Sequence, residues 1–188
     1  INAAARVKPL PVFRCPSDIG EPTFELHESH DHSHPQQHHH QFPIEMATAN
    51  YIGVFGTLDM HDVFEHGNGR ADGTCFLNRG VRLADISDGL SQTFIVGERC
   101  SKLAMSTWVG VIGCAEHGPA RVVGVGEFPP NSEDYPEQYF HNFSSLHPSG
   151  THFLLADGSV RLIVESMDVR IYRNMCTRSA GDITDENG

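Results

Sequence analysis

The spacing of apolar and polar positions along the chain predicts short strands joined by turns. The clearest case is residues 151–164, where two β-prone stretches flank Asp157-Gly158. Asp-Gly between such stretches is typical of a two-residue hairpin with a type I′ turn, because both central residues of that turn need a positive φ. The pattern therefore predicts a β-hairpin with one strand at 151–156 and the other at 159–164.

The remaining apolar runs predict more strands than helices. Short β-prone runs bounded by turn residues lie at 50–56, 93–96, 107–112 and 121–125. Helical spacing is clearest over 167–178, where Val169, Tyr172 and Cys176 recur on one side. Polar stretches rich in glycine or proline predict long loops at 59–74 and 126–139.

This distribution of elements predicts a strand-dominated α+β fold built on an antiparallel sheet. The 188 residues are enough for one globular domain, over residues 1–188, with a polar tail at 182–188. An exposed face of such a sheet needs a cover. We expect that cover to be an N-terminal α-helix that is absent from this chain, which begins with Ile1-Asn2 and no initiator Met.

Charge narrows the classes of partner. The formal net charge of −11 argues against nucleic acid and against an anionic membrane surface, since both are bound by clustered Lys and Arg. No apolar run reaches the roughly 20 residues that a membrane-spanning helix needs. The chain is therefore predicted to have no nucleic-acid partner.

Residues 27–41, HESHDHSHPQQHHHQ, form a low-complexity stretch with almost no apolar residues, and we expect an exposed loop there. Neutral imidazole is a common ligand for Zn²⁺, Cu²⁺ and Ni²⁺. The candidate metal ligands are the histidines of this stretch: His27, His30, His32, His34, His38, His39 and His40. The alternative is a solvated loop without a dedicated site, because a flexible loop has no fixed coordination geometry.

Acidic turns offer a weaker candidate for Ca²⁺. Closely spaced side-chain oxygens lie at 85–89, 157–159 and 182–186, but none of these runs matches an EF-hand loop. Turn and capping chemistry explains them better. His147 and Asp157 could also converge on a cation, but a hairpin would separate them by roughly 20–30 Å. We therefore interpret Asp157 as a turn residue and His147-Pro148 as shaping the chain before the hairpin.

Catalytic motifs are missing from the sequence. It contains no G-x-S-x-G, no phosphate-binding or dinucleotide-binding glycine pattern and no H-E-x-x-H, so we predict that the protein is not an enzyme. The five cysteines include no C-x-x-C pair. They could form up to two disulfides in an oxidising compartment, or remain as buried thiols.

Four runs, taken in order, resemble one bacterial family. They are FRCPSD at 13–18, Asn50-Tyr51 with Gly53, ISDGLSQT at 86–93 with Gly97-Glu98, and the run 145–163. Together they resemble the domain of unknown function 1559 family, whose members are prepilin-like and carry a processing-associated domain named for a histidine, nine residues and Asp-Gly. Ser87, Gln92 and Ser149 depart from the family's Thr, Asn and Gly. The histidine-rich stretch is not part of the family pattern.

The resemblance implies a pilin-like or pseudopilin-like subunit of the bacterial cell envelope. Such a subunit is exported, processed by a prepilin peptidase and held at the membrane only through its N-terminal helix. Its globular part would face the periplasm or the exterior, and its partners would be further copies of itself or other pilin-like subunits. The resemblance also implies a cysteine on that helix as a partner for Cys15. The alternative function is a metal-binding module that uses the histidine-rich stretch.

Overall fold

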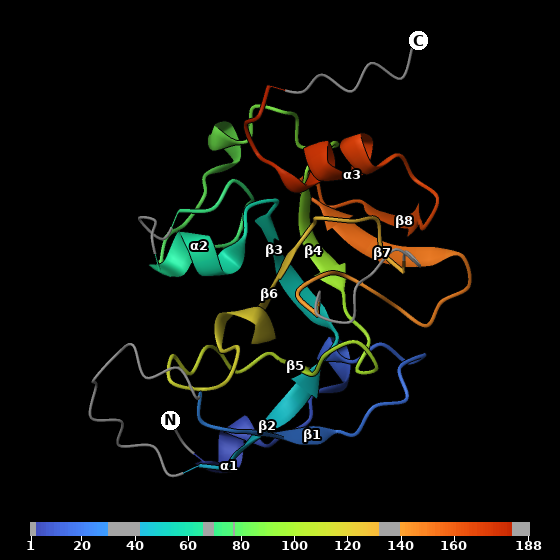
Figure 1. The fold of residues 1–188 in the computed structure, drawn as a ribbon. Helices are drawn as coiled ribbons and strands as arrows, with labels where there is room; N and C mark the ends of the chain where they lie inside the picture. Colours follow the sequence, from blue (N-terminus) through green and yellow to red (C-terminus); the bar gives the residue numbers. More distant parts are fainter. Residues whose placement is uncertain (1–2, 30–41, 66–69, 77, 132–139, 182–188) are drawn as a thin grey trace.

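The computed structural model describes residues 3–29, 42–65, 70–76, 78–131 and 140–181, which form two β-sheets and few helices (Figure 1). The smaller sheet has the order β1-β2-β5 and the larger one the order β6-β3-β4-β7-β8. The smaller sheet comprises β1 (Thr23–Leu26), β2 (Ile44–Ala49) and β5 (Ser106–Thr107). The larger sheet comprises β3 (Tyr51–Gly56), β4 (Phe94–Glu98), β6 (Val123–Val125), β7 (Gly150–Leu155) and β8 (Val160–Val164). The predicted strand-dominated α+β class is confirmed.

Helices are short in the described part of the chain. They are α1 (Ala3–Arg6), α2 (Met60–Glu65) and α3 (Val169–Cys176), with single 3-10 turns η1 (Pro11–Phe13), η2 (Leu83–Asp85) and η3 (Pro119–Arg121). The helix predicted from spacing is α3, and Asp168 caps it by accepting hydrogen bonds from the backbone N–H of Arg170 and Ile171. No helix among these residues is both long and apolar enough to cross a bilayer.

Several predicted boundaries change in the structure. The strand expected over 107–112 is reduced to the two residues of β5, and α2 lies within the stretch predicted to be a loop. β1 and β2 flank the histidine-rich stretch and were not predicted. All strand pairs are antiparallel except β3 with β6, which is parallel.

The hairpin of β7 and β8 is confirmed, but its predicted type I′ turn is wrong. The Leu155 N–H donates to the Ser159 carbonyl, so the loop contains three residues. The Gly158 N–H donates back to the Leu155 carbonyl, and Gly158 has a φ of +86°. Asp157 is not among the described non-glycine residues with a positive φ. A three-residue loop of this kind is a type I turn followed by a left-handed glycine.

One face of the larger sheet packs against α3. The Tyr172 ring lies 6.1 Å from the Phe94 ring and 6.0 Å from the Phe153 ring, and all three side chains are fully buried. Because successive residues of a strand point to opposite faces, Phe153 faces this core and its neighbours His152 and Leu154 face the other side. The larger sheet therefore has one covered face and one that carries His152 and Leu154.

Asn50 connects the two sheets. It is the single residue between β2 and β3, and its side chain is almost completely buried. Its Oδ1 accepts from the Cys15 N–H at 3.0 Å, and its Nδ2 donates to the Arg99 carbonyl at 3.0 Å. Asn50 thus holds the segment that contains Cys15 against the end of β4, at the boundary between the sheets.

Candidate functional site

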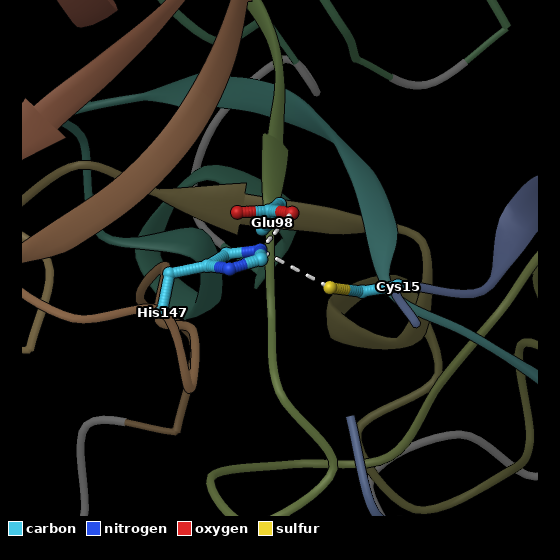
Figure 2. Close-up of side chains that lie close together, drawn as sticks. All are labelled: Cys15, Glu98 and His147. Atoms are coloured by element: carbon cyan, nitrogen blue, oxygen red, sulfur yellow. Dashed lines mark hydrogen bonds and ion pairs between the residues drawn. The ribbon is translucent and has the colours of Figure 1, made fainter. Parts of the chain in front are cut away.

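Three side chains from distant parts of the sequence meet at this boundary. The Nε2 atom of His147 lies 3.3 Å from the Sγ atom of Cys15 and 3.3 Å from the Oε1 atom of Glu98. All three ligand-capable atoms lie within 4.8 Å of one another. Figure 2 shows the tip of the His147 ring pointing toward the other two side chains, with a dashed line to each. We call Cys15, Glu98 and His147 the thiol–carboxylate–imidazole cluster.

Glu98 is the buried centre of the cluster. It is the last residue of β4, and only 3% of the residue is exposed. Its Oε2 accepts from the His152 backbone N–H at 2.8 Å and lies 3.1 Å from His152 Nδ1. These contacts fix Oε2 on β7 and leave Oε1 directed at His147.

His147 is held by the loop that precedes β7. Its backbone N–H donates to Ser145 Oγ at 3.1 Å, and Ser145 Oγ in turn donates to the Gly150 carbonyl at 2.7 Å. The Nδ1 atom of the His147 ring lies 3.4 Å from Ser17 Oγ. Both ring nitrogens therefore face polar groups, and the ring has a defined orientation.

Burial and charge act together on the thiol. Burial raises the pKa of Cys15, and the negative charge of Glu98 raises it further. Burial also raises the pKa of Tyr51, with added contributions from Cys15 and Glu98. The charge of Glu98 therefore opposes ionisation of Cys15, and negative charge on Glu98 or Cys15 opposes ionisation of Tyr51. A thiol in these surroundings is neutral at ordinary pH.

A cleft of about 460 Å³ opens beside the cluster. Tyr51, Val96, Leu154 and Val160 form its apolar walls, and the cluster together with His152 forms its polar end. The cleft lies on the face of the larger sheet opposite α3, because Leu154 alternates with the core residues Phe153 and Leu155. A small ligand could reach the cluster from this side.

Two kinds of chemistry use a thiol, an imidazole and a carboxylate. A nucleophilic cysteine needs a histidine whose one nitrogen takes the thiol proton while its other nitrogen is oriented by a third group. Here a single nitrogen, Nε2, faces both Cys15 Sγ and Glu98 Oε1. The raised pKa of Cys15 also disfavours a thiolate nucleophile. Three atoms that converge on one point suit a metal ion better.

The predicted histidine-rich site falls mainly outside the described residues. His30, His32, His34, His38, His39 and His40 all lie in 30–41 and are not described. His27 is exposed, and its carbonyl accepts from the Glu116 N–H at 2.9 Å. Among the described residues, the cluster of Cys15, Glu98 and His147 is the only group of three or more His, Cys, Asp or Glu side chains that could hold one metal ion. The histidine-rich site remains a prediction.

The acidic turns have structural partners. Asp88 accepts from the backbone N–H of Ala180 and Gly181, and Asp85 pairs with Arg82. Asp157 accepts from the N–H and hydroxyl of Ser159 and takes no part in the cluster around His147. The described acidic turns thus use their oxygens in turns and caps.

All five cysteines are free thiols.

Sequence reasoning missed Cys15 and Glu98 as partners of His147. The available signal was the set of four runs: 13–18 contains Cys15, the second run supplies Asn50, Gly97-Glu98 supplies the carboxylate, and the fourth supplies His147. Each run thus contributes one residue to the cluster or its support. Spacing alone does not reveal that runs so far apart meet.

Fold and site together define a strand-dominated α+β domain that carries a thiol–carboxylate–imidazole cluster at a cleft. A family model described as a protein of unknown function (DUF1559) matches residues 1–170, so the chain belongs to this family. Searches among curated proteins and among solved structures gave no significant match.

Proposed function

We propose that this protein is a structural subunit of the bacterial cell envelope, the globular part of a pilin-like or pseudopilin-like protein. Membership of the DUF1559 family is compatible with this role. The observation that carries the proposal is an apolar sheet face left uncovered by the described residues. A subunit that assembles through a helix needs such a face.

The uncovered face is centred on β8. Val160, Leu162 and Val164 are 62%, 44% and 41% exposed, whereas Ile163 between them is buried in the core. Val160 is paired with Leu154 and Leu162 with His152, so this apolar row continues onto β7 and into the cleft. β8 is also an edge strand, and an apolar edge strand without a cover favours association.

The proposed mechanism is assembly. An apolar N-terminal helix, from the same subunit or from a neighbouring one, covers the row on β8 and anchors the protein at the membrane. The acidic remainder of the domain faces the periplasm or the exterior, and the protein contacts further copies of itself or other pilin-like subunits. No enzymatic step and no nucleic acid takes part.

Expression of the complete gene in a bacterium that has a prepilin peptidase tests this proposal. We expect the protein to be shortened at its N-terminus, methylated there and recovered in the envelope fraction, as measured by mass spectrometry and fractionation. An unprocessed protein in the cytosolic fraction would contradict it.

A pair of variants tests the role of the uncovered face. Leu162→Asp places a charge on the row, and we expect it to abolish cross-linking between subunits while the protein stays folded. Leu83→Asp makes the same change at an exposed leucine on η2 and is expected to cross-link normally. Equal cross-linking of both variants would remove the β8 row as the assembly surface.

A further inference from the structure

We propose that Cys15, Glu98 and His147 bind one divalent transition-metal ion of the zinc class. The proposal rests on the positions of described side chains and not on the histidine-rich stretch. It does not rest on the assembly role, because all three ligands are side chains of the described residues.

The distances within the cluster already match such a site. Cys15 Sγ to His147 Nε2 and His147 Nε2 to Glu98 Oε1 are both 3.3 Å. In a tetrahedral zinc site the corresponding separations are about 3.3 to 3.6 Å, given metal–ligand bonds of about 2.0 to 2.3 Å. The three atoms lie within 4.8 Å of one another, so an ion needs only a small adjustment of the side chains.

Charge in the cluster favours a cation. Glu98 is a buried carboxylate whose ion-pair partners among the described residues are His147 and His152, neither of which carries a permanent charge. Burying a charge without a charged partner is costly. An ion between Sγ, Oε1 and Nε2 would compensate Glu98 and would stabilise the thiolate of Cys15.

Each proposed ligand is oriented by a hydrogen bond with another part of the protein, as is usual in metal sites. Asn50 fixes the backbone of Cys15, and Ser145 fixes the backbone of His147. His152 holds Oε2 of Glu98 through its backbone N–H and lies with its ring nitrogen beside the same oxygen. Contacts of this kind orient metal ligands, and losing one commonly lowers metal affinity by about 10 to 100-fold.

The type of ligand selects the type of ion. A thiolate and an imidazole are ligands of Zn²⁺ and related ions, whereas Mg²⁺ and Ca²⁺ prefer sites made of oxygen atoms. Three protein ligands leave a fourth position, and all three side chains line the same cleft as Tyr51 and Leu154. A water molecule or a small donor ligand from the cleft can complete the coordination there.

The test first removes the competing histidines. In the 188-residue chain, all seven histidines of 27–41 are replaced by glutamine, and Zn²⁺ binding is measured by equilibrium dialysis with elemental analysis. We expect one Zn²⁺ per chain to remain. Co²⁺ is then used as a spectroscopic probe, and we expect a thiolate-to-cobalt charge-transfer band in the near ultraviolet. A folded protein that binds no Zn²⁺, or binds Co²⁺ without this band, overturns the proposal.

Matched variants in the same background identify the ligands. Cys15→Ser is expected to abolish the charge-transfer band and His147→Gln to weaken Zn²⁺ binding by at least about tenfold. Cys75→Ser and His61→Gln, which change a half-buried cysteine and an exposed histidine elsewhere, are expected to have no effect. Circular dichroism checks the fold of each variant. Loss of the band in Cys75→Ser but not in Cys15→Ser overturns the assignment.

A disulfide is the competing fate of Cys15. If Cys15 pairs with a cysteine upstream of this chain, the thiol is not available as a ligand. Mass spectrometry of the complete protein under non-reducing conditions distinguishes the two. We expect a free or metal-bound Cys15, and a disulfide at this residue in the mature protein overturns the metal proposal without affecting the assembly proposal.

Discussion

Glu98 and Arg99 are neighbours at the end of β4, and both are charged residues with almost no exposed surface, yet their surroundings differ. The Arg99 guanidinium donates to backbone carbonyls, including those of Asn142, Ala120 and Val123. Glu98 is surrounded by side chains that can gain or lose a proton, namely Cys15, His147 and His152. Arg99 faces the backbone of several loops, and Glu98 faces a cleft.

The difference shows that burial of a charge does not by itself indicate a functional site. Carbonyl partners belong to the folded backbone and cannot be exchanged for a ligand, so Arg99 stabilises the fold. The thiol and imidazole partners of Glu98 are themselves metal ligands, and a cleft gives access to them. The nature of the partners, rather than the degree of burial, separates the two residues.

The largest effect is expected from Arg99→Met. This change leaves several buried carbonyls without a donor, and we expect it to lower the free energy of unfolding by about 3 kcal/mol or more. Arg161→Met changes an exposed arginine on β8 and should cost less than about 0.5 kcal/mol. Denaturant unfolding followed by the fluorescence of Trp108 measures both. Equal stability of the two variants would contradict the structural role of Arg99.

Acid pH is expected to lower the free energy of unfolding through His141, which lies near Arg99. Burial, with the nearby Arg99 charge, lowers the pKa of His141 from its ordinary value of 6.5 to about 4. Between these two values the unfolded chain binds a proton that the folded chain does not. Stability therefore falls as the pH decreases from 6.5 to 4, by up to about 3 kcal/mol.

His141→Gln isolates this contribution. The variant lacks the titrating ring, so we expect its free energy of unfolding to fall less steeply over the same pH range. His27→Gln changes an exposed histidine and should keep the slope of the original protein. Parallel pH profiles for the original protein and His141→Gln would show that His141 is protonated equally in the folded and unfolded chains.

Glu98→Gln is expected to have a smaller effect on stability than Arg99→Met and a specific effect on Cys15. In metal-free protein we expect a loss of about 1 kcal/mol, because His152 keeps an acceptor but loses a charged one. Removing the carboxylate charge lowers the pKa of Cys15, so its alkylation by iodoacetamide should begin at lower pH.

Peptide mass spectrometry measures that alkylation residue by residue. Cys75, whose pKa is raised by burial and not by Glu98, is the internal reference and should react identically in both proteins. If the pH profile of Cys15 does not move in Glu98→Gln, then the carboxylate does not act on the thiol.

The smallest effect is expected at Ser149, two residues after His147. Ser149 has a φ of +70°, a conformation that costs less for glycine, which the family pattern has at this position. We expect Ser149→Gly to raise the free energy of unfolding by about 0.5 to 1 kcal/mol, because the entropic cost of ordering a glycine offsets part of the relieved strain. The affinity for Zn²⁺ should not change, since Ser145 still holds His147. A large change in affinity would show that strain in this loop sets the position of the imidazole.

Local patterns predicted the elements that have a strong period. The hairpin of β7 and β8 and the helix α3 follow from apolar spacing and from Asp157-Gly158. β2 was missed because five of its six residues are buried, so its polar and apolar positions do not alternate. The type I′ turn was wrong because the loop length depends on which residues of the two strands pair, and that is decided by the sheet.

The sequence by itself determined the fold class, the acidic character and, through four ordered runs, the family. Only the tertiary structure decided that Cys15 and His147, which are 132 positions apart, meet on Glu98. The physical reason is that contact between such residues depends on strand register and on the link through Asn50, and neither leaves a local period in the sequence. His147, which the sequence marked as one end of a motif with Asp157, has its partners elsewhere in the fold.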